Sequence, residues 1–207
     1  MSLPGLQRIR ERIAILAVAM IGASALVGCA PTQSSFHAKD ITGVLPRLEF
    51  QLTSGSGRNL TAADLRGKTT LLYFGYTQCP DACPMTLTYI SAALKQLGAE
   101  ADRVRVLFVS VDPQRDTPEV LKRYVTSFGP QVIGLTGSDA QLTTVTRRYR
   151  VAYRRDPPNS DGDYAVYHSS AVFVFDGQGR ARLLATPSSA NDGLAEDLRA
   201  LIGPSHS

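Results

Sequence analysis

The sequence predicts an α/β domain in which a central sheet is covered by helices on both faces. Short apolar runs rich in β-branched residues alternate with longer segments that begin with helix-capping residues. Near-continuous apolar strands of this kind are typical of a sheet buried between layers of helices. The composition agrees, because 43% hydrophobic and 19% charged residues are normal for a globular domain.

The first predicted elements are a hairpin and a buried strand. Residues 50–52 and 59–60 flank the turn-forming segment Ser54-Gly-Ser-Gly57, so we expect a β-hairpin at the N-terminal side of the domain. The apolar run 69–74 predicts a strand. A loop with two cysteines follows it, and then a helix that reaches about Leu97.

Two strand–helix units come next. The strands are expected at residues 104–111 and 132–136. One helix is expected to open at Thr117-Pro118-Glu119, and the other to start at Ser138 and run to about Arg148. Thr117 can cap the first of these helices, because Pro118 follows it at the favoured first helical position. Ser138 and Gln141 form the pattern of a capping box at the start of the second helix.

A second hairpin and a helix complete the domain. Residues 171–175 and 182–185 flank the turn Asp176-Gly-Gln-Gly179, and a last helix is expected at about 193–202. Strands that alternate with helices and then form a hairpin predict a mixed central sheet flanked by helices.

The N-terminal region resembles an export signal. Residues 1–28 combine a basic start, a short apolar run and an exit through small residues. Leu26-Val27-Gly28-Cys29 resembles the bacterial lipoprotein signal, in which the cysteine is lipidated and becomes the mature N-terminus. The alternative is an uncleaved membrane anchor in which Cys29 has no role. Either way we expect a domain tethered outside the cytoplasm, on the periplasmic side of a bacterial membrane.

The remaining boundaries follow from composition. Residues 29–45 are expected to be a tether, residues 46–203 the domain and residues 204–207 a tail. The whole chain carries a formal charge of +4. Removal of residues 1–28 takes away three arginines and one glutamate, which leaves 19 basic and 17 acidic residues. This small excess gives no support for nucleic-acid binding.

Cys79 and Cys83 are the residues most informative about function. At a spacing of four they would lie on one face of a helix, about one turn apart. Two such thiols can close into a disulfide or bind one soft metal ion, and the spacing alone does not decide between these chemistries. A helix N-terminus would favour the thiolate form of both. We expect Asp81 to cap this helix and Met85 to pack in the core.

Copper(I) is soft and prefers thiolates, and an imidazole can complete a three-coordinate site. Of the three histidines, His37 lies in the predicted tether and His206 at the C-terminus, so His168 is the candidate third ligand. It precedes a strand that we expect to lie beside the cysteine strand. Tetrahedral zinc would lack one protein ligand in such a site.

Three segments, residues 74–85, 109–118 and 167–177, resemble the Sco/SenC family of copper-handling proteins, and the likeness extends over residues 46–202. The family has a thioredoxin-like fold, although the cysteine spacing here is wider by one residue than in thioredoxins. Thioredoxins also carry a cis-proline where this chain has Ser169-Ser170. A peroxiredoxin is disfavoured because Leu72 stands where its proline would be.

The resemblance implies that Cys79, Cys83 and His168 hold one copper ion. It also puts Asp112 close to these ligands; the alternative is an ordinary turn aspartate before Pro113. A protein of this family would take copper from a donor protein and help to build the binuclear copper site in a subunit of cytochrome c oxidase, without turnover as an enzyme. The alternative is a thiol-disulfide reductase that keeps the copper-ligand cysteines of that subunit reduced.

Overall fold

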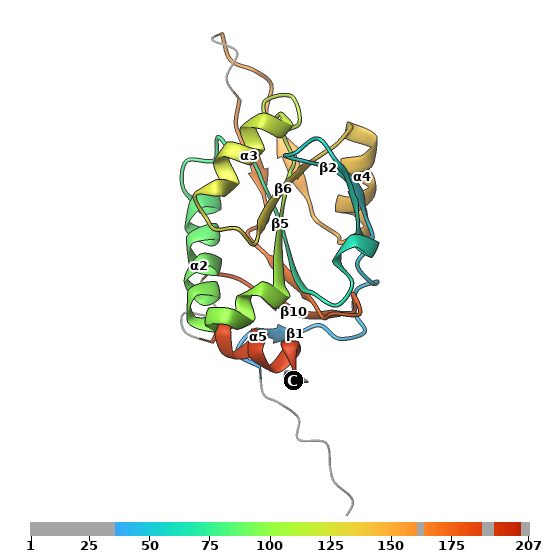
Figure 1. Ribbon diagram of the computed structural model, residues 1–207. Helices are drawn as coiled ribbons and strands as arrows, with labels where there is room; N and C mark the ends of the chain where they lie inside the picture. The colour runs from blue at the N-terminus through green and yellow to red at the C-terminus, as the bar shows by residue number, and fades with distance from the viewer. Residues whose placement is uncertain (1–35, 161–163, 188–192, 204–207) are drawn as a thin grey trace, which may run out of the picture. The chain divides into compact units, whose positions relative to one another are not determined.

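A computed structural model describes residues 36–160, 164–187 and 193–203 (Figure 1). In these ranges eight strands form one sheet in the order β1-β10-β9-β4-β5-β6-β2-β3, and a separate two-stranded ribbon pairs β7 with β8. The strands of the sheet are β1 (Lys39–Asp40), β2 (Gln51–Ser54), β3 (Asn59–Thr61), β4 (Thr69–Gly75), β5 (Val104–Ser110), β6 (Val132–Thr136), β9 (Val172–Phe175) and β10 (Ala181–Ala185).

The ribbon consists of β7 (Tyr153–Arg155) and β8 (Val166–His168). The helices are α2 (Ala82–Leu97), α3 (Pro118–Thr126), α4 (Asp139–Arg148) and α5 (Leu194–Ile202), with short 3₁₀ turns η2 (Ala62–Leu65) and η3 (Gly98–Arg103). Thr117 and Ser138 cap α3 and α4 as predicted, because each hydroxyl accepts a hydrogen bond from a backbone N–H of the first helical turn.

The centre of the sheet is parallel and almost entirely buried. β4 pairs in parallel with β5, and β5 with β6, whereas β9 pairs with β4 in the antiparallel sense. All seven residues of β4 are buried. Right-handed crossovers from β4 to β5 and from β5 to β6 put α2 and α3 on one face. Figure 1 shows α4 on the other side of the sheet. The predicted thioredoxin-like sheet flanked by helices is therefore confirmed.

The hairpin at the N-terminal side is also confirmed, and it is part of the main sheet. β2 pairs with β3 and, through its other edge, with β6. The second hairpin, β9-β10, has the predicted turn at residues 176–179. Both hairpins place their strands beside the parallel centre, so they extend the sheet on its two sides.

The predicted tether is too long at its C-terminal end. β1 pairs with β10, and Ala38 and Ile41 are buried in the core. The buried carboxylate of Asp197 in α5 accepts hydrogen bonds from the backbone N–H groups of His37 and Ala38. The folded domain therefore includes residues from 36 onward. The predicted signal, the start of the tether and the tail at 204–207 lie outside the described residues.

None of the helices in the described part of the chain has both the length and the apolar character needed to cross a membrane.

Candidate metal centre

Three candidate ligands for a soft metal ion meet at the C-terminal end of β4. Cys79 comes from the loop after this strand, Cys83 from the first turn of α2, and His168 from the end of β8. Their ligand atoms all lie within 4.8 Å of one another. The Sγ atom of Cys83 is 3.2 Å from Nε2 of His168. The structure therefore brings together the three residues that the sequence singled out.

The two cysteines do not share a helix as their spacing suggested. α2 begins at Ala82, so only Cys83 is helical. Asp81 occupies the N-cap position, but its side chain makes no capping hydrogen bond. Instead, the Sγ atom of Cys79 accepts a hydrogen bond from the backbone N–H of Cys83 at 3.3 Å. The sulfur thus replaces the usual capping oxygen, and this contact keeps the two sulfurs close together.

Gly75 makes room for the Cys83 side chain, a role that the sequence analysis missed. A Cβ atom at this position would lie 2.8 Å from Sγ of Cys83 and 2.6 Å from the ring of Phe108. Real Cβ atoms do not approach other atoms so closely. Both neighbours are fully buried. The last residue of β4 must therefore be glycine if the Cys83 sulfur is to occupy its observed position.

The His168 ring is held with one nitrogen free for a metal. Nδ1 is 2.9 Å from the carbonyl oxygen of Ser169, which can only accept, so Nδ1 carries the proton. Nε2 is therefore the unprotonated nitrogen, and it faces Cys83. Burial lowers the pKa of His168, which favours the neutral ring at neutral pH. The rings of Tyr73 and Tyr76 contact the imidazole edge-on.

Burial dominates the ionisation of Cys83. The side chain is fully buried, and this raises its pKa to about 12. The expectation that the helix N-terminus would keep both cysteines as thiolates is therefore wrong for Cys83 in the metal-free protein. The neutral thiol donates its proton toward Nε2 of His168. A copper ion must displace this proton, because the thiolate is the metal ligand.

Copper(I) binding should therefore release at least one proton and strengthen with rising pH across the neutral range. His168 contributes no proton because it is already neutral, whereas Cys83 must lose one. The expected gain in affinity is about tenfold per pH unit for each proton released. Competition against a chromogenic copper(I) chelator at several pH values, corrected for the chelator's own titration, measures this slope. Cys83→Ser should lower the slope by one proton, and a pH-independent affinity in the parent would contradict this assignment.

A buried carboxylate fixes the cysteine loop to the neighbouring strand. Asp116, which the sequence analysis also missed, accepts hydrogen bonds from the Ser110 hydroxyl at 2.6 Å, the Thr77 hydroxyl at 2.6 Å and the Thr77 N–H at 3.0 Å. Thr77 lies two residues before Cys79. Burial raises the pKa of Asp116 from the ordinary value of an aspartate. These hydrogen bonds position the loop that carries Cys79.

The hydrogen bonds of the Asp112 carboxylate go to Arg115 and Tyr164 and not to the three candidate ligands. The carboxylate accepts hydrogen bonds from Nε of Arg115 and from the hydroxyl of Tyr164, both at 2.5 Å. The guanidinium of Arg115 lies 3.7 Å from the centre of the Tyr164 ring and 5.9 Å from that of Tyr76. Tyr76 in turn contacts His168. Asp112 is therefore connected to His168 indirectly, by successive contacts through Arg115 and Tyr76.

The ribbon that presents His168 was not predicted. Tyr153 in β7 is the register partner of His168 in β8. Arg155 anchors the ribbon, because its Nε donates to the backbone carbonyl of Val111 at 2.9 Å and its Nη1 donates to Gln114. The third ligand therefore depends on contacts between segments about 40 residues apart in the sequence.

The surface beside the ligands is partly apolar. Cys79 is half-buried, and Met85 and Tyr167 are exposed to 54% and 52%. The expectation that Met85 packs in the core is therefore wrong. His37 takes no part in the centre, because its Nε2 pairs with Glu196 at 2.9 Å. Cys29 and His206 lie outside the described residues.

The donor set suits one copper(I) ion. Two sulfurs and one neutral imidazole nitrogen converge without a carboxylate among them, which is the soft environment that copper(I) prefers. Within the described residues no other group of three metal-binding side chains comes together. Zinc would need a fourth ligand.

Comparison with known proteins gives consistent matches. The family model described as SCO1/SenC matches residues 43–203. The mitochondrial protein SCO2 homolog of Bos taurus is 44% identical over 133 residues, which are 63% of this chain and 50% of that protein. This chain thus spans about half the length of that curated relative.

Solved structures extend the likeness to the whole domain. ScoI of Bradyrhizobium japonicum with copper bound is 41% identical, with a TM-score of 0.67 over 75% of this chain and 98% of that chain. ScoI of Arabidopsis thaliana with copper bound is 35% identical, with a TM-score of 0.67 over 74% and 98%. Because the family match runs through the cysteine loop, the Asp112 segment and the His168 ribbon, this chain belongs to the SCO1/SenC family.

Proposed function

We propose that this protein is a copper chaperone that binds one copper ion through Cys79, Cys83 and His168. The bound copper ion would pass to the copper-site subunit of cytochrome c oxidase and become part of the binuclear copper site there. The observation that carries the proposal is the convergence of two sulfurs and an unprotonated imidazole nitrogen within 4.8 Å. Related proteins with copper bound, from Bradyrhizobium japonicum and Arabidopsis thaliana, support the choice of metal.

The surroundings of the centre suit transfer as well as binding. A three-coordinate copper(I) ion can accept a ligand from a partner before it loses one of its own. Cys79 is the more accessible sulfur, and the exposed side chains of Met85 and Tyr167 provide apolar contact area for a partner. We infer that the recipient approaches over this surface and first displaces Cys79. The donor protein would load copper by the same route in reverse.

We further propose that the domain works on the periplasmic side of a bacterial membrane. The signal-like residues 1–28 and the lipoprotein-like sequence before Cys29 support a lipid anchor at Cys29. Stable anchoring of a protein requires more than one acyl chain, which the modification of a lipoprotein cysteine supplies.

A thiol-disulfide reductase remains the second candidate, because the two cysteines are free and are joined by a hydrogen bond. A reductase would cycle them between dithiol and disulfide and would need His168 less than a metal site does. The two functions therefore differ in their dependence on this histidine.

Copper titration separates the candidates. In the mature chain with Cys29→Ser, anaerobic titration should give one copper per chain, and Cys79→Ser, Cys83→Ser and His168→Ala should each weaken binding by roughly 100-fold or more. His37→Ala is the matched control, since this histidine pairs with Glu196 away from the site. Competition with a copper(I) chelator gives the affinities.

A second assay follows the disulfide exchange of the same variants with a small dithiol. If His168→Ala binds copper as the parent does while the parent exchanges disulfides rapidly, the chaperone proposal fails and the reductase takes its place. If all three variants lose copper and His37→Ala does not, the chaperone proposal is supported.

A further inference from the structure

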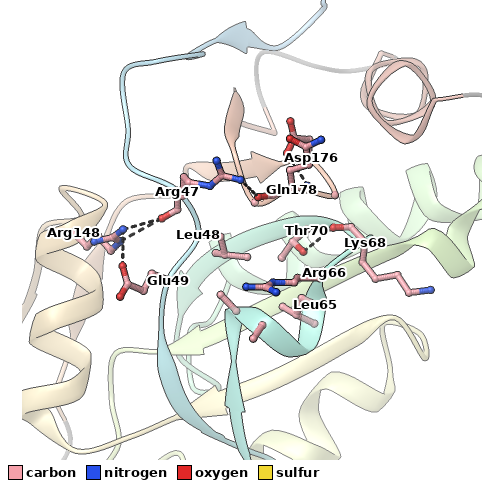
Figure 2. A pocket seen from close by; sticks show the side chains of 14 residues that line it. Arg47, Leu48, Glu49, Leu65, Arg66, Lys68, Thr70, Arg148, Asp176 and Gln178 are labelled. Atoms are coloured by element: carbon pink, nitrogen blue, oxygen red, sulfur yellow. Dashed lines mark hydrogen bonds and ion pairs between the residues drawn. The ribbon is translucent and has the colours of Figure 1, made fainter.

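A basic surface lies at the end of the domain opposite the metal centre. Its main feature is a pocket of about 620 Å³ between the segment after β1, the turn at η2 and the β9-β10 turn. Four cationic side chains line it: Arg47, Arg66, Lys68 and Arg148. Figure 2 shows them around Leu48 and Leu65, which form an apolar part of the wall.

A second hollow of about 250 Å³ continues this surface on the far side of the turn at residues 176–179. It adds Arg103, Arg180 and Arg182 to the lining. The two hollows together present seven cations and two carboxylates, those of Glu49 and Asp176. We call these seven cationic residues and the two hollows between them the basic face.

The carboxylates neutralise only part of this charge. Glu49 pairs with Arg148, and Asp176 pairs with Arg180 and more distantly with Arg182. Arg47 and Lys68 donate to backbone carbonyl groups, which carry no net charge. Arg66 is exposed, and its guanidinium has no hydrogen-bond or ion-pair partner among the described residues. Several positive charges on this face therefore have no carboxylate partner.

The chain enters the domain at the edge of the basic face. Phe36, the first described residue, has its ring 5.8 Å from the guanidinium of Arg182. Arg182 also binds Thr42 through its side chain and Ile41 through its backbone carbonyl. Six residues lie between Cys29 and Phe36, and the seven steps from one to the other reach about 25 Å when fully extended. An anchor at Cys29 would therefore hold this end of the domain within that distance of the membrane surface.

The metal centre and the basic face lie at opposite ends of strand β4. Thr70 lines the main pocket, whereas Gly75 ends β4 and leads into the cysteine loop. The five steps of extended strand from Thr70 to Gly75 span about 17 Å. Figure 1 likewise shows β1, β10 and α5 together at one end of the domain. A membrane bound at the basic face would thus leave the copper site exposed to partners.

We propose that the basic face docks onto the phosphate headgroups of an anionic membrane and so orients the copper site away from the bilayer. The proposal rests on the membrane anchor of the proposed function. An acidic protein or a free phosphate would also suit the charge, but the short tether supplies a membrane surface at this face continuously. The cations are also spread over two hollows, and this arrangement suits a surface with many phosphate headgroups better than it suits a single small anion.

Vesicle binding by the isolated domain tests this docking without the anchor. Residues 36–203 contain the described core, and the match to this chain covers 98% of the solved Bradyrhizobium japonicum chain, so a chain of about this extent forms a defined structure. The domain should co-sediment with vesicles of equal parts phosphatidylglycerol and phosphatidylcholine and much less with pure phosphatidylcholine, and added salt should weaken binding. Arg66→Ala combined with Lys68→Ala should weaken it by about 25-fold, at about fivefold per cation.

Lys122→Ala combined with Arg123→Ala is the matched control, because it removes the same charge from exposed positions on α3. The proposal is overturned if both double variants lose binding equally, if the two vesicle types bind equally, or if glycerol phosphate binds the domain and the vesicles do not. Copper titration of the Arg66 and Lys68 variant should match the parent. If the full chain binds vesicles and the isolated domain does not, the lipid anchor is supported. Docking of the basic face onto the membrane is then refuted.

Discussion

Replacing Gly75 with alanine is expected to destabilise the domain by about 3 kcal/mol, the upper part of the range for overpacked cores. The new methyl group would overlap Sγ of Cys83 and the ring of Phe108, both of which are fully buried. The strand cannot yield easily, because β4 is paired on both edges. Relief must come from the Cys83 side chain, so copper affinity should fall roughly 10-fold to 100-fold. Denaturant unfolding and chelator competition measure the two effects.

Gly134→Ala separates the loss of stability from the loss of the site. Gly134 lies in β6, and a Cβ atom there would lie 2.9 Å from Cβ of Leu121, so this variant is also overpacked. No metal ligand lies among its close neighbours. It should lose stability and keep its copper affinity under conditions where it is folded. Equal copper affinities in folded Gly75→Ala and folded Gly134→Ala would refute the role of Gly75.

The sequence was sufficient to predict the elements of the fold whose signals are local. β6 and the starts of α3 and α4 lie where the apolar runs and the caps at Thr117 and Ser138 indicated. The three residues that come together as candidate ligands were also predictable, because soft-metal chemistry needs particular residue types and the chain has few cysteines and histidines. The segments resembling the Sco/SenC family supplied the remaining support.

The missed features depend on contacts between distant segments. β7 and β8 have three residues each, which is too short for a periodic pattern, and Arg155 holds their ribbon through the carbonyl of Val111. β1 has two residues and exists through its pairing with β10. No local rule indicates such pairing. The sequence likewise could not show that burial outweighs the helix N-terminus in setting the pKa of Cys83.

Asp116 was missed for a related reason. Its position before Thr117 and Pro118 is typical of a residue near a helix start, and nothing local indicates that it is fully buried. Its role is evident only when Ser110 and Thr77 are brought to it by the fold. Buried polar groups with several partners of this kind are strong candidates for residues that position a site.

Removal of the Asp116 carboxylate should also lower the stability of the domain strongly. Asp116→Ala leaves the Ser110 hydroxyl and both donors of Thr77 without their acceptor, and we expect a loss of about 3 kcal/mol in the free energy of unfolding. Freed from β5, the cysteine loop should also bind copper more weakly. Asp116→Asn keeps the shape and one acceptor oxygen, so it should recover part of both losses. Urea unfolding with and without copper provides the measurement.

The pH dependence of stability shows which of two opposing effects at Asp116 is larger: the cost of burying its charge or the gain from its hydrogen bonds. Burial raises the pKa of Asp116, so the folded state holds this proton more tightly than the unfolded state does. Its contribution to stability is therefore fully present below the ordinary carboxyl pKa of about 4 and is lost as the pH rises through the raised folded value. Asp116→Asn has no such proton, and the neighbouring Asp112 and Arg115 are common to both proteins. The stability of the parent relative to Asp116→Asn should therefore fall with rising pH. A difference that grew with pH would mean that the donors of Ser110 and Thr77 outweigh the cost of burying the charge.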